Sequence, residues 1–306
     1  MGWGILLVLF RHCDEFIWPK NFELFLKHIV PLGNVGVELF LFVSGIGLFY
    51  SIQKNSIVDF YKRRFLRVIP EYILITGIGF LIVELLGSQS ITDFFYRFST
   101  LSIWQGDGAV WYIPFILICY LFYPIAIKIV NNLNGLTISL LFTYLVLFTM
   151  AFLFPVTFIN LEQPITRIPI FLIGCHFGVK VYYGEKSSLM LWRGFIVLFI
   201  VLRALKILFF SNYCYEHIII RTANIFLALF LIWLICGYLN KVRLVSFLGT
   251  ISLELYLVHR FINMIYILLP IYHGFVVYFL IIIPLSVIIS FYLHKLYEKY
   301  YARKEI

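Results

Sequence analysis

Stretches of about 20 mostly apolar residues recur along this 306-residue chain and constrain its fold more than any other feature. The segment 136–154, for example, contains no charged residue. A run of that length spans a bilayer as a helix, whereas a membrane β-strand would alternate apolar and polar residues, which this segment does not. With 62% hydrophobic and 13% charged residues, the chain is more apolar than a soluble domain requires. We therefore expect an all-α, polytopic membrane protein.

We expect about ten transmembrane helices in a single membrane domain over residues 1–306, because no long polar linker or internal repeat divides the chain. The first apolar run, from Trp3 to Phe10, is too short for a hydrocarbon core of about 30 Å, so this helix looks truncated. Either residues precede Met1 or the helix is a stub. The other nine spans are expected at 35–52, 68–86, 109–127, 136–154, 168–183, 191–210, 222–239, 250–269 and 275–293.

The net charge of +9 gives no reason to expect nucleic acid as a partner, because the cations are dispersed between the apolar spans. Cytoplasmic loops of membrane proteins are rich in Lys and Arg. When Lys and Arg are counted in the segments between the expected spans, more of them lie on the side of the two termini. The rule therefore places both termini in the cytoplasm. The five cysteines form no CxxC pair, so we expect neither a disulfide framework nor a metal site.

The junction between the first two full spans combines an acidic helix with a basic segment. Glu38 lies near the start of a span, where a carboxylate either faces a cavity or partner or stays hydrated at the interface. A segment that we expect to be a loop then carries Lys62, Arg63, Arg64 and Arg67. Arg64 and Arg67 are three residues apart and, if helical, would share a face and could clamp a phosphate. The alternative is an ordinary basic loop that meets anionic lipid.

His12 is the candidate catalytic residue. It follows an apolar run and has Asp14 and Glu15 within one turn. A neighbouring carboxylate can orient an imidazole and stabilise its protonated form, which suits a general base acting on a hydroxyl. The alternative is a histidine at the membrane interface beside ordinary loop charges.

Two further groups of polar and aromatic residues are candidates for a substrate path. Trp111 and Tyr112 open a span, where they either anchor the helix at the interface or stack on a sugar. Ser252, Tyr256 and His259 are spaced by four and three residues, so a helix would place them on one face and form a polar cavity wall. Glu254 would point elsewhere.

Five segments together resemble the acyltransferase 3 family of membrane proteins, whose members acetylate polysaccharides, lipopolysaccharide, peptidoglycan and some small molecules. The resemblance covers both ends of the chain, and the middle, near 130–245, is similar only in hydropathy. The segments, in the family's order, are ILLVLFRH, GNVGVELFLFVSG, FYKRRFLRVIPEY, VWYIPFILICYLFYP and ISLELYLVH.

The resemblance implies a domain of about ten helices that transfers an acyl group, usually acetyl, from acyl-CoA to a hydroxyl, with no other cofactor. His12 corresponds to the family's essential histidine, and Arg64 with Arg67 corresponds to its RxxR pair. A basic residue that usually precedes the histidine by about one span would fall near Met1.

The resemblance also suggests roles. Arg63, Arg64 and Arg67 would hold the CoA phosphates, His12 would deprotonate the acceptor, and Ser252, Tyr256 or Glu38 would shape the polar path. Because His12 is expected near the outer face and the arginines at the inner face, either pantetheine reaches into the membrane or the acyl group is relayed.

We therefore expect an O-acetyltransferase of the bacterial inner membrane, part of the cell-envelope machinery, whose acceptor is a surface polysaccharide or its lipid-linked sugar precursor. The main alternative is a transporter or flippase for a lipid-linked oligosaccharide, which should show interrupted helices in two related halves. A third possibility is a non-catalytic assembly or sensor protein derived from the family. Such a protein would have little need of both His12 and the Arg64 and Arg67 pair.

Overall fold

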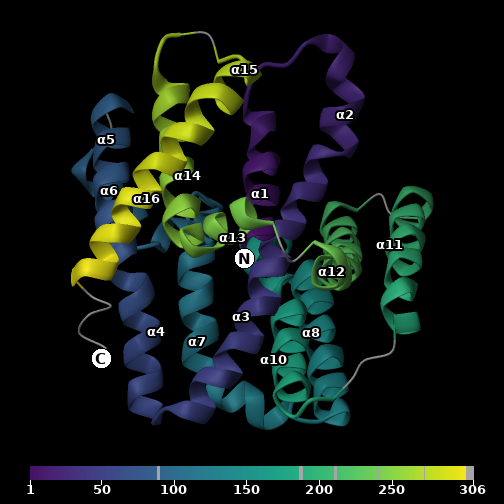
Figure 1. Cartoon of the computed structure of the whole chain (residues 1–306). Helices are drawn as coiled ribbons and strands as arrows, with labels where there is room; N and C mark the ends of the chain where they lie inside the picture. Colours follow the sequence, from purple (N-terminus) through teal and green to yellow (C-terminus); the bar gives the residue numbers. More distant parts are fainter. Residues whose placement is uncertain (88–89, 186–188, 210–211, 240–241, 272, 301–306) are drawn as a thin grey trace. The chain divides into compact units, whose positions relative to one another are not determined.

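The computed structural model describes residues 1–87, 90–185, 189–209, 212–239, 242–271 and 273–300. Within these ranges the chain is helical almost throughout and forms no β-strand (Figure 1). The all-α fold that the apolar spans predicted is therefore confirmed.

The helices pack into two compact units that are each built from separate stretches of chain. The first unit comprises Met1–Gly36, Lys62–Ser102 and Arg243–Ile306, and the second comprises Val37–Tyr61 and Ile103–Val242. Each unit is described by itself below. The single domain expected over residues 1–306 stays a prediction.

The first unit is arranged around α14, which packs against α1, α5 and α16 (Figure 1). Gly79 of α5 permits one of these contacts, because a Cβ atom there would lie 2.3 Å from the ring of Phe261. Phe80 meets the same ring edge to face at 5.0 Å. The helices of this unit are α1 (Gly2–Arg11), η1 (His12–Glu15), η2 (Lys20–Phe22), α2 (Glu23–His28), η3 (Val30–Asn34), most of α4 (Ile57–Glu71), η4 (Tyr72–Thr76), α5 (Gly77–Gly87), α6 (Ile91–Phe98), α13 (Arg243–Thr250), α14 (Ser252–Leu268), α15 (Phe275–Val277), η6 (Tyr278–Ile282) and α16 (Ile283–Tyr300).

The second unit is a bundle in which α8 packs against α9, α10 and α12, and α11 packs against α12. Asparagine caps start two of these helices, since Asn132 accepts the N–H of Gly135 at 2.9 Å and Asn212 accepts that of Cys214 at 3.0 Å. The helices are α3 (Val35–Lys54), α7 (Tyr112–Ile129), α8 (Leu133–Leu153), α9 (Pro155–Ile165), α10 (Ile168–Tyr182), α11 (Leu189–Phe209) and α12 (Tyr213–Tyr238), and η5 (Leu101–Gln105) lies at the boundary between the units.

Glycines bring the backbones of α3 and α10 together. A Cβ atom on Gly45 would lie 2.6 Å from the amide nitrogen of Cys175, and one on Gly174 would lie 2.4 Å from the carbonyl oxygen of Phe42. Small residues at such crossings let the helix backbones approach closely. In a membrane this close packing stabilises the helix pair, because the surrounding lipid is as apolar as the side chains.

The described residues contain seven helices or continuous helix runs that are long and apolar enough to span a membrane. The bent pair α13 and α14, which turns by 78°, would make eight. The expected count of about ten is therefore not confirmed. Helix α1 has only ten residues, which is about half the required length. Helix α11 has three basic residues in its sequence, Arg193, Arg203 and Lys206, and does not meet the same test.

The basic segment expected as a loop is helical instead. A break at Asn55 and Ser56 ends α3, and the Ser56 hydroxyl then caps α4 by accepting the N–H of Asp59 at 3.1 Å. The residues between 62 and 67 are mostly Lys, Arg and Leu, which are good helix formers, so α4 continues through them. After Pro70 the chain passes through a single π-helical turn, η4, and continues as α5.

Candidate functional site

His12 and Glu15 form an ion pair at the end of α1. The helix stops at Arg11 and the chain tightens into the 3₁₀ turn η1. Such a turn has three residues per revolution, so side chains at i and i+3 align. Nδ1 of His12 accordingly lies 2.8 Å from Oε1 of Glu15. Arg11 and Asp14 form a parallel pair one residue earlier. The sequence predicted a neighbouring carboxylate for His12, and the structure identifies it as Glu15.

Helix α14 fixes Glu15 from the other side. Nη1 of Arg260 donates to Oε1 of Glu15 at 2.6 Å, and Nδ2 of Asn263 donates to Oε2 at 3.3 Å. Arg260 and Asn263 are three residues apart, which puts them on one face of the helix. Asn263 is fully buried. Both carboxylate oxygens of Glu15 are thus engaged, and His12 is held by a carboxylate that is itself held in place.

The hydrogen bonds determine which nitrogen of His12 is available. Burial would raise the pKa of Glu15, but the hydrogen bond to His12 and the positive charges of His12 and Arg260 outweigh it and lower the pKa to about 2. Glu15 is therefore a carboxylate at neutral pH and only accepts hydrogen bonds. Nδ1 of His12 must carry the proton, so in the neutral ring Nε2 presents a lone pair. This is the arrangement that a general base requires.

A second histidine, His259, lies against His12. The two ring centres are 5.2 Å apart. His259 is fully buried, and its Nδ1 donates to the carbonyl oxygen of Leu255 at 2.7 Å, one turn earlier in α14. The ring of Tyr256 lies 6.0 Å from that of His259, and Ser252 is the first residue of the helix. That these three residues form the wall of a polar path stays a prediction. Tyr256 is buried and Ser252 is half-buried.

A cavity of about 270 Å³ lies beside the Glu15 and Arg260 pair. Its polar wall consists of Glu15, Arg260 and Arg97, and the remaining wall is mainly apolar. Arg97 is bound to Glu84 at 3.1 Å. The remaining lining residues are Val83, Gly87, Met264, Ile267 and Leu268. The cavity provides space next to the group that holds His12.

Arg67 of the predicted phosphate clamp binds a buried carboxylate. Its Nη2 donates to both oxygens of Glu254, at 2.9 and 3.1 Å, and its guanidinium lies 4.6 Å from the ring centre of Tyr297. Glu254 is fully buried and also accepts Nδ1 of His294 at 2.8 Å. Arg63 is exposed and Arg64 is half-buried on the same helix. Arg64 and Arg67 lie three residues apart on α4 and not on the expected loop, and Arg67 already has a partner.

Glu38, Trp111 and Tyr112 belong to the second unit, where a buried arginine organises them. Arg167 at the start of α10 is 1% exposed, and its Nε lies 3.3 Å from Oε1 of Glu38, which is fully buried. The Arg167 guanidinium also covers the ring of Trp111, and Cζ of Arg167 lies 4.8 Å from the centre of that ring. Glu38 is therefore a buried carboxylate with an arginine partner, and its place on a substrate path stays a prediction. Tyr112 is buried and meets Trp111 edge to face.

The same unit contains a second buried ion pair. Nε of Arg221 donates to Oε1 of Glu162 at 2.6 Å, and Nδ1 of His217 lies 3.1 Å from the same oxygen. Gln163 bonds to both Arg167 and Arg221. Each carboxylate here has an arginine, so these contacts tie α3, α9, α10 and α12 together with balanced charge.

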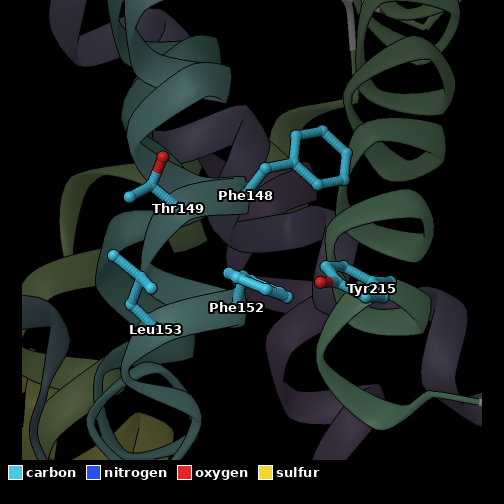
Figure 2. Close-up of a pocket in the computed structure, with 5 residues that line it drawn as sticks. All are labelled: Phe148, Thr149, Phe152, Leu153 and Tyr215. Atoms are coloured by element: carbon cyan, nitrogen blue, oxygen red, sulfur yellow. The ribbon is translucent and has the colours of Figure 1, made fainter.

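An open pocket of about 520 Å³ between α8 and α12 contains none of the predicted residues (Figure 2). The rings of Phe148, Phe152 and Tyr215 point into the space between the two helices. Thr149 and Leu153 complete the lining. Among the described residues that line it, Thr149 and Tyr215 supply the polar side-chain groups, and there is no histidine or carboxylate.

Several residues of these clusters were not predicted from the sequence, namely Arg260, Asn263, Glu254, His294, Arg167 and Glu162. One signal was available for two of them. Arg260 and Asn263 are polar residues on an apolar span, immediately after the motif that ends at His259. Their partner, Glu15, lies about 250 residues away, which no local spacing reveals.

The comparisons with known proteins agree with the resemblance. Residues 2–295, essentially the whole chain, match a family model described as an acyltransferase domain. Neither a curated protein nor a solved structure matches the chain significantly. The match gives no support to a transporter, and together with the seven or eight apolar helices it indicates an integral membrane acyltransferase. The chain therefore belongs to the acyltransferase 3 family.

Proposed function

We propose that this acyltransferase moves an acyl group, most simply acetyl, from acyl-CoA to a hydroxyl of a cell-surface glycan or of its lipid-linked precursor. The observation that carries the proposal is the fixed orientation of His12. Its Nδ1 is bound to Glu15, and Glu15 is bound to Arg260 and Asn263. Only Nε2 is left for the acceptor.

The chemistry follows from that orientation. Nε2 of His12 takes the proton of the acceptor hydroxyl as its oxygen attacks the thioester carbonyl carbon. The new C–O bond forms, the C–S bond breaks, and CoA leaves as a thiolate. The thiolate then takes from His12 the proton that came from the acceptor hydroxyl. The imidazolium that forms between these steps is stabilised by the Glu15 carboxylate, which is the role of the carboxylate in catalytic triads.

The basic face of α4 is the proposed site for the CoA phosphates. Arg63 and Arg64 are exposed and half-buried, respectively, and would bind phosphate oxygens as charge-assisted donors. Arg67, on the same helix, would add a further positive charge to the phosphate site while it also donates to Glu254. The distribution of Lys and Arg along the sequence supports placing this face and both termini on the cytoplasmic side of a bacterial inner membrane, where acyl-CoA is made.

The acceptor would approach His12 along polar residues. Ser252, Tyr256 and His259 on α14 line the proposed path in the first unit. Glu38, Trp111 and Tyr112 are proposed as further parts of it. The contacts of Glu38 and Trp111 with Arg167 hold these two side chains in place, whether or not they line the path.

The proposal is tested by following labelled acetyl from acetyl-CoA into the envelope glycan of membranes that contain the protein. We expect a base-labile ester on the glycan with the unchanged protein and none with His12→Ala. His28→Ala is the matched control, because His28 is an exposed histidine of α2 to which no role is assigned. Equal labelling with His12→Ala and the unchanged protein would overturn the proposal.

A further inference from the structure

His259 has a buried acceptor atom with no donor. Its Nδ1 donates to a backbone carbonyl oxygen, so in the neutral ring Nε2 carries only a lone pair. Nε2 is buried, and no group in the described part of the chain donates to it. A buried polar atom without a partner is costly and uncommon in folded proteins. Nε2 of His176 is buried in the same way, but only His259 lies beside the candidate base His12, so this atom points to a ligand.

The position of His259 indicates what kind of ligand would supply the donor. Its ring centre is 5.2 Å from that of His12, whose Nδ1 is likewise occupied, by Glu15. The site thus contains two neighbouring imidazoles that both offer Nε2 as an acceptor. A single hydroxyl has one proton and satisfies only one of them. An acceptor with two adjacent hydroxyls satisfies both.

We propose that Nε2 of His259 binds a second hydroxyl of the acyl acceptor, next to the hydroxyl that His12 deprotonates. The pair would thereby select acceptors with neighbouring hydroxyls, as in sugars, over alcohols with one. This inference rests on the proposed function and adds a specificity residue to it. A monohydric alcohol would leave Nε2 of His259 unsatisfied, which corresponds to a preference for the diol of about ten- to a hundredfold.

The surroundings suit such a role because they hold the two rings in place. Asn263 and Arg260, on the same helix as His259, bind the Glu15 carboxylate that orients His12. A cavity of about 270 Å³ is lined by Glu15, which contacts His12, and by Arg260, which follows His259 in the chain, so it lies close to both histidines. Rigid placement of the first contacts is what specificity for a small ligand requires.

Two substitutions separate this role from a structural one. His259→Asn keeps a donor for the Leu255 carbonyl but removes the acceptor at the position of Nε2. His259→Gln can place its amide oxygen at that position but gives up the donor to Leu255. If His259 only stabilised α14, Asn would be the better replacement. If it binds a hydroxyl, Gln would be.

The test uses the purified protein in liposomes with acetyl-CoA and either trans-1,2-cyclohexanediol or cyclohexanol as the acceptor, and measures the rate of ester formation. We expect the unchanged protein and His259→Gln to prefer the diol. We expect the ratio of the diol rate to the cyclohexanol rate to fall towards one in His259→Asn. A His259→Asn variant that retains the full preference would overturn the inference.

A binding measurement without acyl donor keeps the inference distinct from the proposed function. In ¹⁵N spectra of histidine-labelled protein, the His259 signals are assigned by their loss in His259→Asn. We expect the Nδ1–H tautomer and a shift of the Nε2 signal on addition of the diol, also in His12→Ala. If ester formation fails in every variant but this shift occurs, the proposed function fails and the hydroxyl site stands. An Nε2–H tautomer, or no shift, would overturn the site.

Discussion

Glu15 is the residue through which the rest of the site acts on His12. It accepts Nδ1 of His12 and is fixed by Arg260 and Asn263. Glu15→Gln keeps the size of the side chain but removes the charge that stabilises the imidazolium and sets the tautomer. We expect the turnover number for acyl transfer to fall by about 10²- to 10⁴-fold, the usual contribution of general base catalysis. The release of CoA thiol measures it.

Asp14 provides the matched control for Glu15. It lies in the same 3₁₀ turn and pairs with Arg11, but it is exposed and does not contact His12. Asp14→Asn should therefore leave turnover within about twofold, since surface ion pairs contribute little. Comparable losses in Asp14→Asn and Glu15→Gln would show that the turn, and not the orientation of His12, is what matters.

The low pKa of Glu15 also predicts how stability depends on pH. The folded pKa of about 2 lies below the ordinary value of 4.5. A depressed pKa stabilises the folded protein fully above the ordinary value, and this stabilisation is lost as the pH falls through the folded value. The difference in melting temperature between the unchanged protein and Glu15→Gln should be constant above pH 4.5 and shrink towards pH 2. A difference that stays constant throughout this range would contradict the assignment.

At the scale of elements, the pair of Arg67 and Glu254 ties α4 to α14. Arg67→Gln would leave the fully buried Glu254 without its arginine, which costs about 3–5 kcal/mol for a buried pair. The double variant Arg67→Gln with Glu254→Gln removes both charges and should recover much of that loss. Denaturant unfolding in detergent measures the three stabilities. A double variant less stable than Arg67→Gln would contradict the pairing.

Arg63→Gln is the matched control on α4. Arg63 is exposed, so its loss should change stability by less than about 0.5 kcal/mol. If Arg63 binds a CoA phosphate as proposed, the same substitution should instead raise the KM for acyl-CoA. Stability and KM thus separate the two roles that a basic helix can have.

The crossing of α3 and α10 can be tested with two glycines of α3. Gly45→Ala would place a methyl group 2.6 Å from the backbone of Cys175, and overpacking of this kind costs about 1–3 kcal/mol. Gly47→Ala, two residues later, meets no atom within 4 Å and should be neutral or slightly stabilising. The midpoints of thermal unfolding in detergent compare them. Equal effects would show that the crossing is not tight at Gly45.

At the scale of the whole molecule, the sequence predicted well what depends on local pattern. Apolar length predicts an all-α fold with several membrane-spanning helices, although not their number, and the carboxylates within one turn of His12 suggest a histidine held by a carboxylate. The basic segment at 62–67 is helical although its charge favours a loop, because Lys, Arg and Leu are also good helix formers.

What the sequence could not predict are partners that are distant along the chain. Arg260 reaches Glu15 across 245 residues, Arg67 reaches Glu254 across 187, and Arg167 meets Glu38 only in the folded second unit. No local period encodes such pairs. Each is recognised only when the packing of the helices is known.

Turnover of acetyl-CoA by the purified protein in liposomes shows whether His12 is catalytic, when His12→Ala and His28→Ala are prepared in parallel. We expect CoA thiol to be released by the unchanged protein and by His28→Ala, and release to fall to the background rate with His12→Ala. Release at the same rate in all three preparations would contradict the central claim that His12 is the base of an acyl transfer.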